Sequence, residues 1–76
     1  MPGDTPVTKR VLKEGMHGED VEELQARLHA LGYMRKNEVD GDFGKITKGA
    51  VLCFQFEKKL EVDACVGPAT RAALGI

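Results

Sequence analysis

The feature that most constrains this chain is a repeat within its own sequence. The stretch VDGDFGKIT, residues 39–47, returns as VDACVGPAT, residues 62–70, and the match continues from Ala50 to Ala73 at the same offset of 23 residues. In each copy an Asp is followed, at fixed distances, by a Gly and then by a Thr. We therefore expect two copies of one loop-and-helix unit, each opening with the same kind of turn.

The first predicted helix spans residues 20–31 and precedes both copies of the repeat. Its apolar residues recur at steps of three and four, which is the stripe of an amphipathic helix: Val21, Leu24, Leu28 and Leu31. Asp20 is the expected N-cap, with Glu23 as its capping-box partner. Gly32 is the expected C-cap in the left-handed conformation.

The second and third predicted helices begin inside the two copies of the repeat. The second runs from Lys45 to about Lys59, with an inward stripe of four apolar residues: Ile46, Ala50, Val51 and Phe54. The third is short and starts at Gly67-Pro68, since Pro is well suited to the first helical position. Its narrow apolar side consists of Ala69, Ala72, Ala73 and Leu74. The expected fold class is all-α, a small three-helix bundle with an internal loop–helix repeat.

The repeated Asp residues are expected to close turns. Asp40 and Asp63 lie the same distance before a predicted helix, where a carboxylate can accept backbone N–H groups in an Asx turn. Glycines give the backbone extra freedom there, and each Thr places a hydroxyl in the first helical turn. Besides the two Asp residues, the positions assigned to turn structure are Gly41, Gly44, Gly67, Thr47 and Thr70.

The Asp-Gly-Asp sequence at residues 40–42 resembles a calcium loop, but its spacing is wrong. An EF-hand needs acidic ligands at fixed positions, an invariant Gly and a final Glu. A frame that starts at Asp40 puts Lys45 at the glycine position and Val51 at the last ligand position. Moving Gly44 to the glycine position leaves the first three ligand positions without acidic residues. We predict no calcium site.

The spacing of Cys and His predicts neither a zinc site nor a catalytic centre. His17 and His29 are twelve residues apart, as are Cys53 and Cys65, which is longer than the usual chelate arms of about two to five residues. The two Cys residues form either one disulfide or two separate small buried side chains, and both alternatives remain open. Cys53 is expected within a helix, shielded from acting as an activated thiolate. We predict no catalytic residue, metal or cofactor.

Length and charge exclude further classes of function. The chain has 76 residues and a net charge of −1, which leaves room for one small domain and gives no broad attraction to nucleic acid or membrane. Its apolar runs are too short to span a bilayer, and its N-terminus lacks the apolar core of a signal peptide. The early Pro and Gly residues favour a linker over residues 1–10 and a domain over residues 11–76.

Taken together, the motifs resemble those of a known family. The pattern G-x-x-V-x-x-L-Q-x-x-L-x-x-L-G-Y, residues 18–33, is followed by V-D-G-x-F-G-x-x-T-x-x-A-V-x-x-F-Q over residues 39–55 and by V-G-x-x-T-x-x-x-L over residues 66–74. This order is similar to the peptidoglycan-binding domain, a small three-helix module attached to bacterial and phage cell-wall hydrolases. The chain differs from the family at Ala64, where Gly is frequent, and at Phe56, where a polar residue is usual.

The resemblance implies a binding function without catalysis. The expected ligand is peptidoglycan, the expected partner is a covalently linked hydrolase or phage endolysin domain, and the expected location is the cell wall, outside the cytoplasm. It also implies a monomer without nucleic-acid or membrane partners. A related domain occurs in the pro-segments of matrix metalloproteinases, so a protein-interaction or inhibitory pro-domain is the alternative.

A shallow groove beside the loop of residues 33–47 is the predicted ligand site. Peptidoglycan presents sugars, amides and peptide carboxylates, which require an aromatic platform and several hydrogen-bonding groups. The free N–H groups at the start of the second helix suit a stem-peptide carboxylate. The residues predicted to bind are Gln25, Tyr33, Arg35, Asp42, Phe43, Gly44, Lys45 and Thr47. A role in the turns for Gln25 and Thr47, and a place in the core for Phe43, remain open alternatives.

Overall fold

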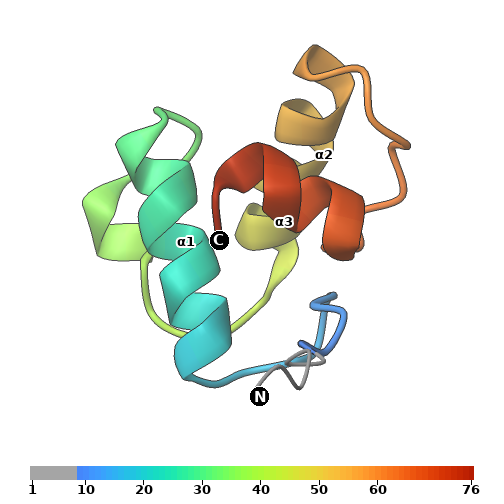
Figure 1. Ribbon diagram of the computed structural model, residues 1–76. Coiled ribbons are helices and arrows are strands. Elements are labelled where there is room, and N and C mark those ends of the chain that lie inside the picture. Colours follow the sequence, from blue (N-terminus) through green and yellow to red (C-terminus); the bar gives the residue numbers. More distant parts are fainter. Residues whose placement is uncertain (1–8) are drawn as a thin grey trace.

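The computed structural model describes residues 9–76 and confirms the all-α architecture. Its elements, in chain order, are α1 (Glu19–Ala30), the short 3₁₀ helix η2 (Lys36–Glu38), α2 (Lys45–Glu57) and α3 (Pro68–Leu74). Figure 1 shows α1 on one side of the molecule and α2 on the other, while the segment before α1 runs along one end. The linker expected over residues 1–10 lies outside the described residues, except for Lys9 and Arg10.

One apolar core joins all three helices and the loops between them. Phe54 of α2 is fully buried at its centre, and the Tyr33 ring packs edge-on against it with the ring centroids 5.5 Å apart. The other buried apolar side chains come from all three α-helices, from the segment before α1 and from every connecting segment: Leu12, Val21, Leu24, Leu28, Met34, Phe43, Ala50, Val51, Val66 and Leu74. Because loop residues contribute to this core, the loops hold fixed positions relative to the helices.

The segment before α1 connects the two copies of the repeat. Leu12 and Val66 exchange backbone hydrogen bonds of 3.2 and 2.8 Å, which attaches this segment to the second copy. Phe43 in the first copy donates to Met16 at 2.8 Å, and its carbonyl accepts from Gly15 at 2.9 Å. These long-range bonds place both repeat loops against the same short stretch of chain.

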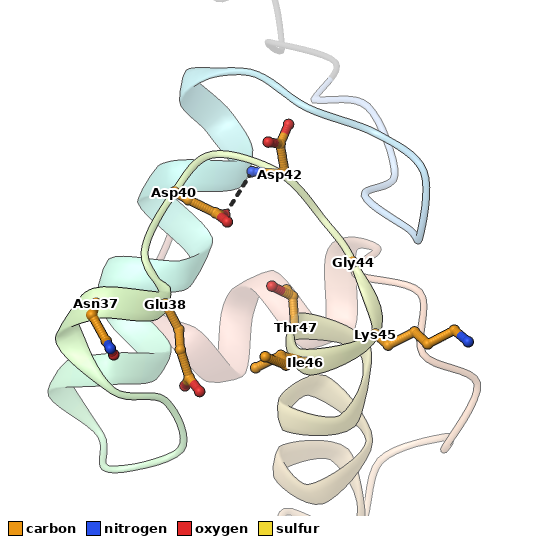
Figure 2. A pocket seen from close by; sticks show the side chains of 8 residues that line it. All are labelled: Asn37, Glu38, Asp40, Asp42, Gly44, Lys45, Ile46 and Thr47. Carbon is orange, nitrogen blue, oxygen red and sulfur yellow. Dashed lines mark hydrogen bonds between the residues drawn. The ribbon is translucent and has the colours of Figure 1, made fainter.

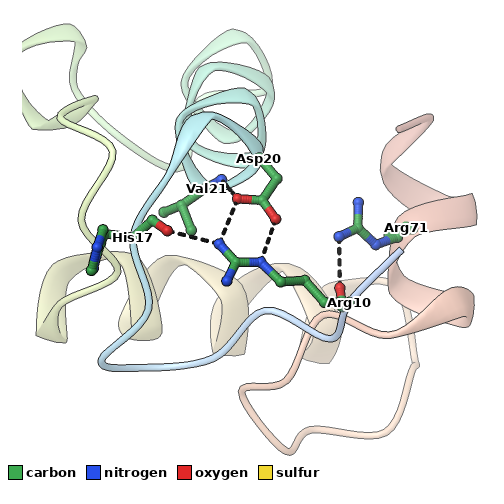
Figure 3. Close-up of polar contacts among 5 residues, drawn as sticks. All are labelled: Arg10, His17, Asp20, Val21 and Arg71. Atoms are coloured by element: carbon green, nitrogen blue, oxygen red, sulfur yellow. Dashed lines mark hydrogen bonds and ion pairs between the residues drawn. The ribbon is translucent and has the colours of Figure 1, made fainter. Parts of the chain in front are cut away.

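The N-terminus of α1 differs from the prediction. The helix begins one residue earlier than expected, with Gly18 as N-cap, and neither Asp20 nor Glu23 caps it. Asp20 instead accepts two hydrogen bonds from Arg10, from Nε at 2.6 Å and from Nη2 at 2.9 Å, and its Oδ1 also accepts the backbone N–H of the neighbouring Val21 at 2.9 Å (Figure 3). A bidentate guanidinium–carboxylate pair is stronger than a cap to a neutral N–H. The Arg10 hydrogen bond lowers the pKa of Asp20 to about 2.

Arg10 also connects α1 to α3. Its Nη2 donates to the His17 carbonyl at 2.7 Å, and its own carbonyl accepts from Nη2 of Arg71 at 2.8 Å (Figure 3). Arg71 is a buried residue of α3. The sequence pattern gave no reason to expect either arginine in a structural role, because both act on residues distant in the chain.

Three predicted helix faces need correction. Leu31 and Ile46 were expected in apolar stripes, yet they are 40% and 60% exposed. The buried face of α2 is centred on Thr47, Val51 and Phe54, and Ile46 lies about 100° around the helix from Thr47. On α3 the expected alanine face is wrong too, since its buried residues are Thr70, Arg71 and Leu74 and the three alanines are exposed.

The ends of the helices agree better with local chemistry. Gly32 has φ +93° and follows α1, and the Tyr33 N–H donates back to the Leu28 carbonyl at 2.8 Å, as a glycine C-cap predicts. Pro68 occupies the first position of α3 as expected. No helix among residues 9–76 is long and apolar enough to cross a membrane.

The cysteines match neither open alternative fully. Both thiols are free, so the disulfide is absent. Cys65 is half-buried, whereas Cys53 is exposed on α2, which makes the expectation of a shielded Cys53 wrong.

Candidate functional site

The loop before α2 is held by one buried amide side chain. Gln25 of α1 is fully buried, and its Oε1 accepts the backbone N–H groups of Asp40 at 3.0 Å and Gly41 at 2.7 Å. Its Nε2 donates to the Asp42 carbonyl at 2.8 Å, to Oγ1 of Thr47 at 2.9 Å and to Oδ1 of Asp40 at 3.1 Å. Both ends of the amide are therefore satisfied, and the loop is fixed against α1.

The loop before α3 repeats this arrangement with Gln55 of α2. Its Oε1 accepts from the backbone of Asp63 at 3.1 Å and of Ala64 at 3.0 Å. Its Nε2 donates to the Cys65 carbonyl at 2.9 Å, to Oδ1 of Asp63 at 3.0 Å and to Oγ1 of Thr70 at 3.2 Å. Gln55 is not among the functional or turn residues predicted from the sequence. A Gln after an apolar residue in each helix, Leu24-Gln25 and Phe54-Gln55, is the signal that could have revealed the pair.

The repeated Asp side chains close the two turns. Oδ1 of Asp40 accepts the N–H of Asp42 at 3.0 Å, and Oδ1 of Asp63 accepts the N–H of Cys65 at 2.9 Å. These backbone hydrogen bonds, followed by those from the glutamine amides, lower the pKa of both carboxyls below the usual value. Both groups therefore remain ionised at neutral pH.

Glycine is favoured at one position of the first turn. Gly41 has φ +81°, and a Cβ there would lie 3.6 Å from the Gly18 carbonyl oxygen. The second copy has Ala64 at the equivalent position with φ +64°, so a non-glycine residue adopts a left-handed conformation that costs free energy. Gly44 has φ −105°, which other residues adopt freely, so the prediction that its backbone needs the freedom of glycine is wrong. Gly67 has φ −97° and is the N-cap of α3, at the predicted helix start.

A hollow of about 400 Å³ lies between η2, the first repeat loop and the start of α2. We call it the first-repeat pocket. Figure 2 shows its lining residues, which are Asn37, Glu38, Asp40, Asp42, Gly44, Lys45, Ile46 and Thr47. A second hollow of about 530 Å³ adjoins it, since Glu38 and Ile46 line both. The other residues of this second hollow are Gly32, Tyr33, Met34 and Arg35. We call the two hollows together the groove.

The structure distributes the predicted ligand contacts between the groove and the interior. Tyr33, Arg35, Asp42, Gly44 and Lys45 line the groove, and Thr47 contributes its edge although its side chain is buried.

Two of the predicted ligand contacts are wrong, and the alternatives hold instead. Phe43 is only 2% exposed and belongs to the core, while Gln25 is enclosed by the turn that it binds. Asn37 and Glu38 of η2 and Ile46 of α2, which were not among the residues predicted to bind, also line the groove.

The charges of the first-repeat pocket disfavour a carboxylate ligand there. The first-repeat pocket has three carboxylates, on Glu38, Asp40 and Asp42, against one ammonium on Lys45. In Figure 2 the Lys45 side chain points away from the other lining side chains. Such a surface repels anions and favours hydrogen-bond donors such as hydroxyl, amide and amino groups.

Tyr33 forms the aromatic wall of the groove. Its hydroxyl donates to Oε1 of Glu57 at 2.6 Å, and this bond raises the pKa of the phenol. Its ring packs against Phe54, so the aromatic surface is held in one orientation by both contacts.

Fold and groove together define a small helical binding module built from two loop–helix repeats. The chain belongs to the peptidoglycan binding domain family, whose model matches residues 17–74. The resemblance given by the sequence motifs is thereby confirmed.

Relatives of the chain include cell-wall enzymes that are much longer than it is. A spore cortex-lytic enzyme of Halalkalibacterium halodurans is 46% identical over 65 residues, which cover 86% of this chain but only 19% of the enzyme. The crystal structure of the SleB N-terminal domain has a TM-score of 0.81 and 43% identity, covering 87% of this chain and 89% of that domain. The endolysin of Burkholderia phage AP3 has a TM-score of 0.81 and 34% identity, covering 88% of this chain and 25% of the endolysin.

Proposed function

We propose that this chain is a non-catalytic module that binds peptidoglycan and holds an attached catalytic domain against the cell wall. The match of the family model to residues 17–74 carries the proposal. The chain spans about a fifth of the cortex-lytic enzyme that it matches, which supports a proposal that places the chemistry in other parts of such proteins. Tethering raises the effective concentration of a catalytic domain at its substrate. The module acts outside the cytoplasm, as a monomer without a cofactor.

The relatives also bear on the alternative function. An inhibitory pro-domain of a metalloprotease would use the same fold, but the relatives of this chain include a spore cortex-lytic enzyme and a phage endolysin. Wall binding is therefore the function that we propose.

We place the wall ligand in the groove. The exposed side chain of Ile46 lines both hollows and offers an apolar contact at their junction. The carboxylates of Glu38 and Asp42 offer hydrogen-bond acceptors in the lining of the groove. A sugar face presents C–H groups and hydroxyl donors together, which matches this combination of one apolar contact and several acceptors.

Sedimentation with insoluble peptidoglycan tests the groove. Ile46→Ala should weaken binding, because losing an apolar contact of this size costs about 1–2 kcal/mol, which is about five- to thirtyfold in affinity. The matched control is Val62→Ala, since Val62 is also exposed but lines neither hollow. Circular dichroism of each variant confirms that it is folded.

A second pair of variants tests the charge. Asp42→Asn removes a carboxylate of the groove, and Glu23→Gln removes one from the exposed side of α1. We expect weaker wall binding only for Asp42→Asn. If Ile46→Ala and Asp42→Asn both sediment like wild type, the groove is not the site; if wild type itself stays in the supernatant, the module does not bind the wall.

A further inference from the structure

A third hollow, of about 200 Å³, lies between the end of α2 and the start of α3. We call it the second-repeat pocket. Its lining residues are Leu60, Glu61, Asp63, Cys65, Gly67, Pro68, Ala69 and Thr70. Each of them follows a residue of the first-repeat pocket by 23 positions, from Asn37 and Leu60 at one end to Thr47 and Thr70 at the other. The same backbone positions therefore line both pockets.

The two pockets share their supporting hydrogen bonds as well as their lining. Gln55 fixes the second loop through the same five bonds that Gln25 makes to the first. The second-repeat pocket is thus a repeated feature of the fold with a rigid floor, rather than a chance gap between side chains.

The rims of the two pockets differ in a consistent direction. At equivalent positions, Leu60 replaces Asn37, Cys65 replaces Asp42, Pro68 replaces Lys45 and Ala69 replaces Ile46. The second-repeat pocket keeps two carboxylates, on Glu61 and Asp63, has no cationic side chain in its lining, and gains apolar walls. It therefore repels anions and favours an uncharged group that has both an N–H donor and a small apolar part.

The size of the pocket limits what it can hold. Pockets that enclose drug-sized ligands have about 300–1,000 Å³, so a hollow of about 200 Å³ fits one functional group of a larger ligand. Pro68 has no N–H and occupies the first position of α3, so the lining side chains rather than the end of that helix supply the recognition.

We propose that the second-repeat pocket binds the acetamido group of an N-acetylated amino sugar. The N–H of that group donates to a lining carboxylate, and its methyl group packs against Leu60, Pro68 and Ala69. This subsite rests on the proposed function, because it belongs to the same glycan that the groove binds. A glycan repeats its acetamido groups along the strand, so a second subsite adds affinity through effective concentration.

The two cysteines provide a test within the native chain. Cys65 lines the pocket, whereas Cys53 is exposed on α2 and lines none of the three hollows described. Alkylation by iodoacetamide is followed for each thiol by mass spectrometry, with and without a β-1,4-linked tetramer of N-acetylglucosamine. Near saturation the tetramer should slow Cys65 about tenfold, because the thiol is accessible only in the unbound fraction. Cys53 should react at an unchanged rate.

The corresponding glucosamine tetramer, which lacks the acetyl groups, separates acetamido recognition from general sugar binding. It should leave the alkylation of Cys65 unchanged. Equal protection by the two tetramers, or no protection of Cys65 by either, would overturn the subsite.

Two alanines of α3 provide a matched pair of variants. Ala69→Tyr fills the pocket, while Ala72→Tyr adds the same side chain at another exposed position of α3 that lies outside the lining. The first should bind the N-acetylglucosamine tetramer about tenfold more weakly, the loss expected for one bound group. The second should match wild type. Equal affinities for the two variants would overturn the subsite.

Wall sedimentation distinguishes the two levels of the proposal. If wild type and Ala69→Tyr sediment equally with peptidoglycan and the tetramer leaves Cys65 unprotected, the subsite is overturned and wall binding stands. If wild type does not sediment at all, the wall function fails and the subsite fails with it.

Discussion

Replacing Gln25 by Met tests whether one buried amide holds the first repeat loop in place. Gln and Met have similar helix propensities and similar volumes, so α1 and the core should tolerate the change. What the variant loses is the set of hydrogen bonds to Asp40, Gly41, Asp42 and Thr47. The perturbation therefore isolates the polar contribution of the side chain.

The size of the effect follows from the burial of those partners. The Thr47 side chain is closed to water, whereas Asp40 and Asp42 are exposed and can recover water as a partner. Each buried polar group left without a partner costs about 1–3 kcal/mol. Here the Thr47 hydroxyl is fully enclosed, and the partners in Asp40 and Asp42 are only partly enclosed. We expect a loss of about 2–4 kcal/mol in the free energy of unfolding. That is a large share of the roughly 4–11 kcal/mol usual for a domain of this length.

Urea denaturation followed by circular dichroism measures this loss, with the free energy taken by linear extrapolation at an unchanged m-value. The melting temperature should fall by about 10–25 °C. Gln55→Met should lose a similar amount, because Gln55 makes the equivalent bonds to the second loop. Glu23→Met, on the exposed side of α1, is the control and should stay within about 0.5 kcal/mol of wild type. A Gln25→Met protein as stable as this control would refute the reasoning.

Three further predictions about stability follow from the same structure. Ala64 adopts a left-handed conformation with φ +64°, so Ala64→Gly should stabilise the protein by about 1 kcal/mol in urea denaturation. Gly41→Ala in the equivalent turn should destabilise it by about 1–2 kcal/mol. The opposite signs would contradict the assignment of strain. Gly49 lies inside α2, and a Cβ added there meets nothing within 4 Å. Gly49→Ala should therefore raise the melting temperature, with a gain of about 0.5–1 kcal/mol in the free energy of unfolding. A lower melting temperature would contradict the open space around Gly49. Arg10 lowers the pKa of Asp20 to about 2, so the contribution of Asp20 to folding stability is present above pH about 4 and is lost as the pH falls through about 2. The melting temperatures of wild type and Asp20→Asn should therefore converge over that range. A constant difference between them would refute the linkage.

Much of the fold follows from local sequence. The start of α3 at Pro68 and the end of α1 before Gly32 depend on the backbone preferences of single residues. The start of α2 at Lys45 agrees with the prediction, and the helix ends at Glu57, shortly before the predicted end at about Lys59. The errors concern which face of a helix is buried, as with Ile46. A stripe of apolar residues shows that a segment is helical, but it fixes the centre of the buried face only to within about one residue.

The candidate site was only half predictable. Asp42, Lys45 and Tyr33 line the groove as the sequence suggested, since they lie in the loop or beside it. Phe43 differs because the segment before α1 pairs with its backbone, through Met16, and its ring lies in the core. Nothing local to residues 39–47 encodes that contact.

By itself, the sequence determined the three helices, the family and the meaning of the repeated Asp residues, because each depends on short-range chemistry of the backbone and on spacing along the chain. Only the tertiary structure decided which glutamine binds which loop, that Arg10 joins Asp20 to α3, and that the repeat forms two pockets with different rims. Gln25 lies fifteen residues from Asp40, and Arg10 lies sixty-one from Arg71. Such contacts arise when packing brings distant segments together, and no periodicity along the chain specifies them.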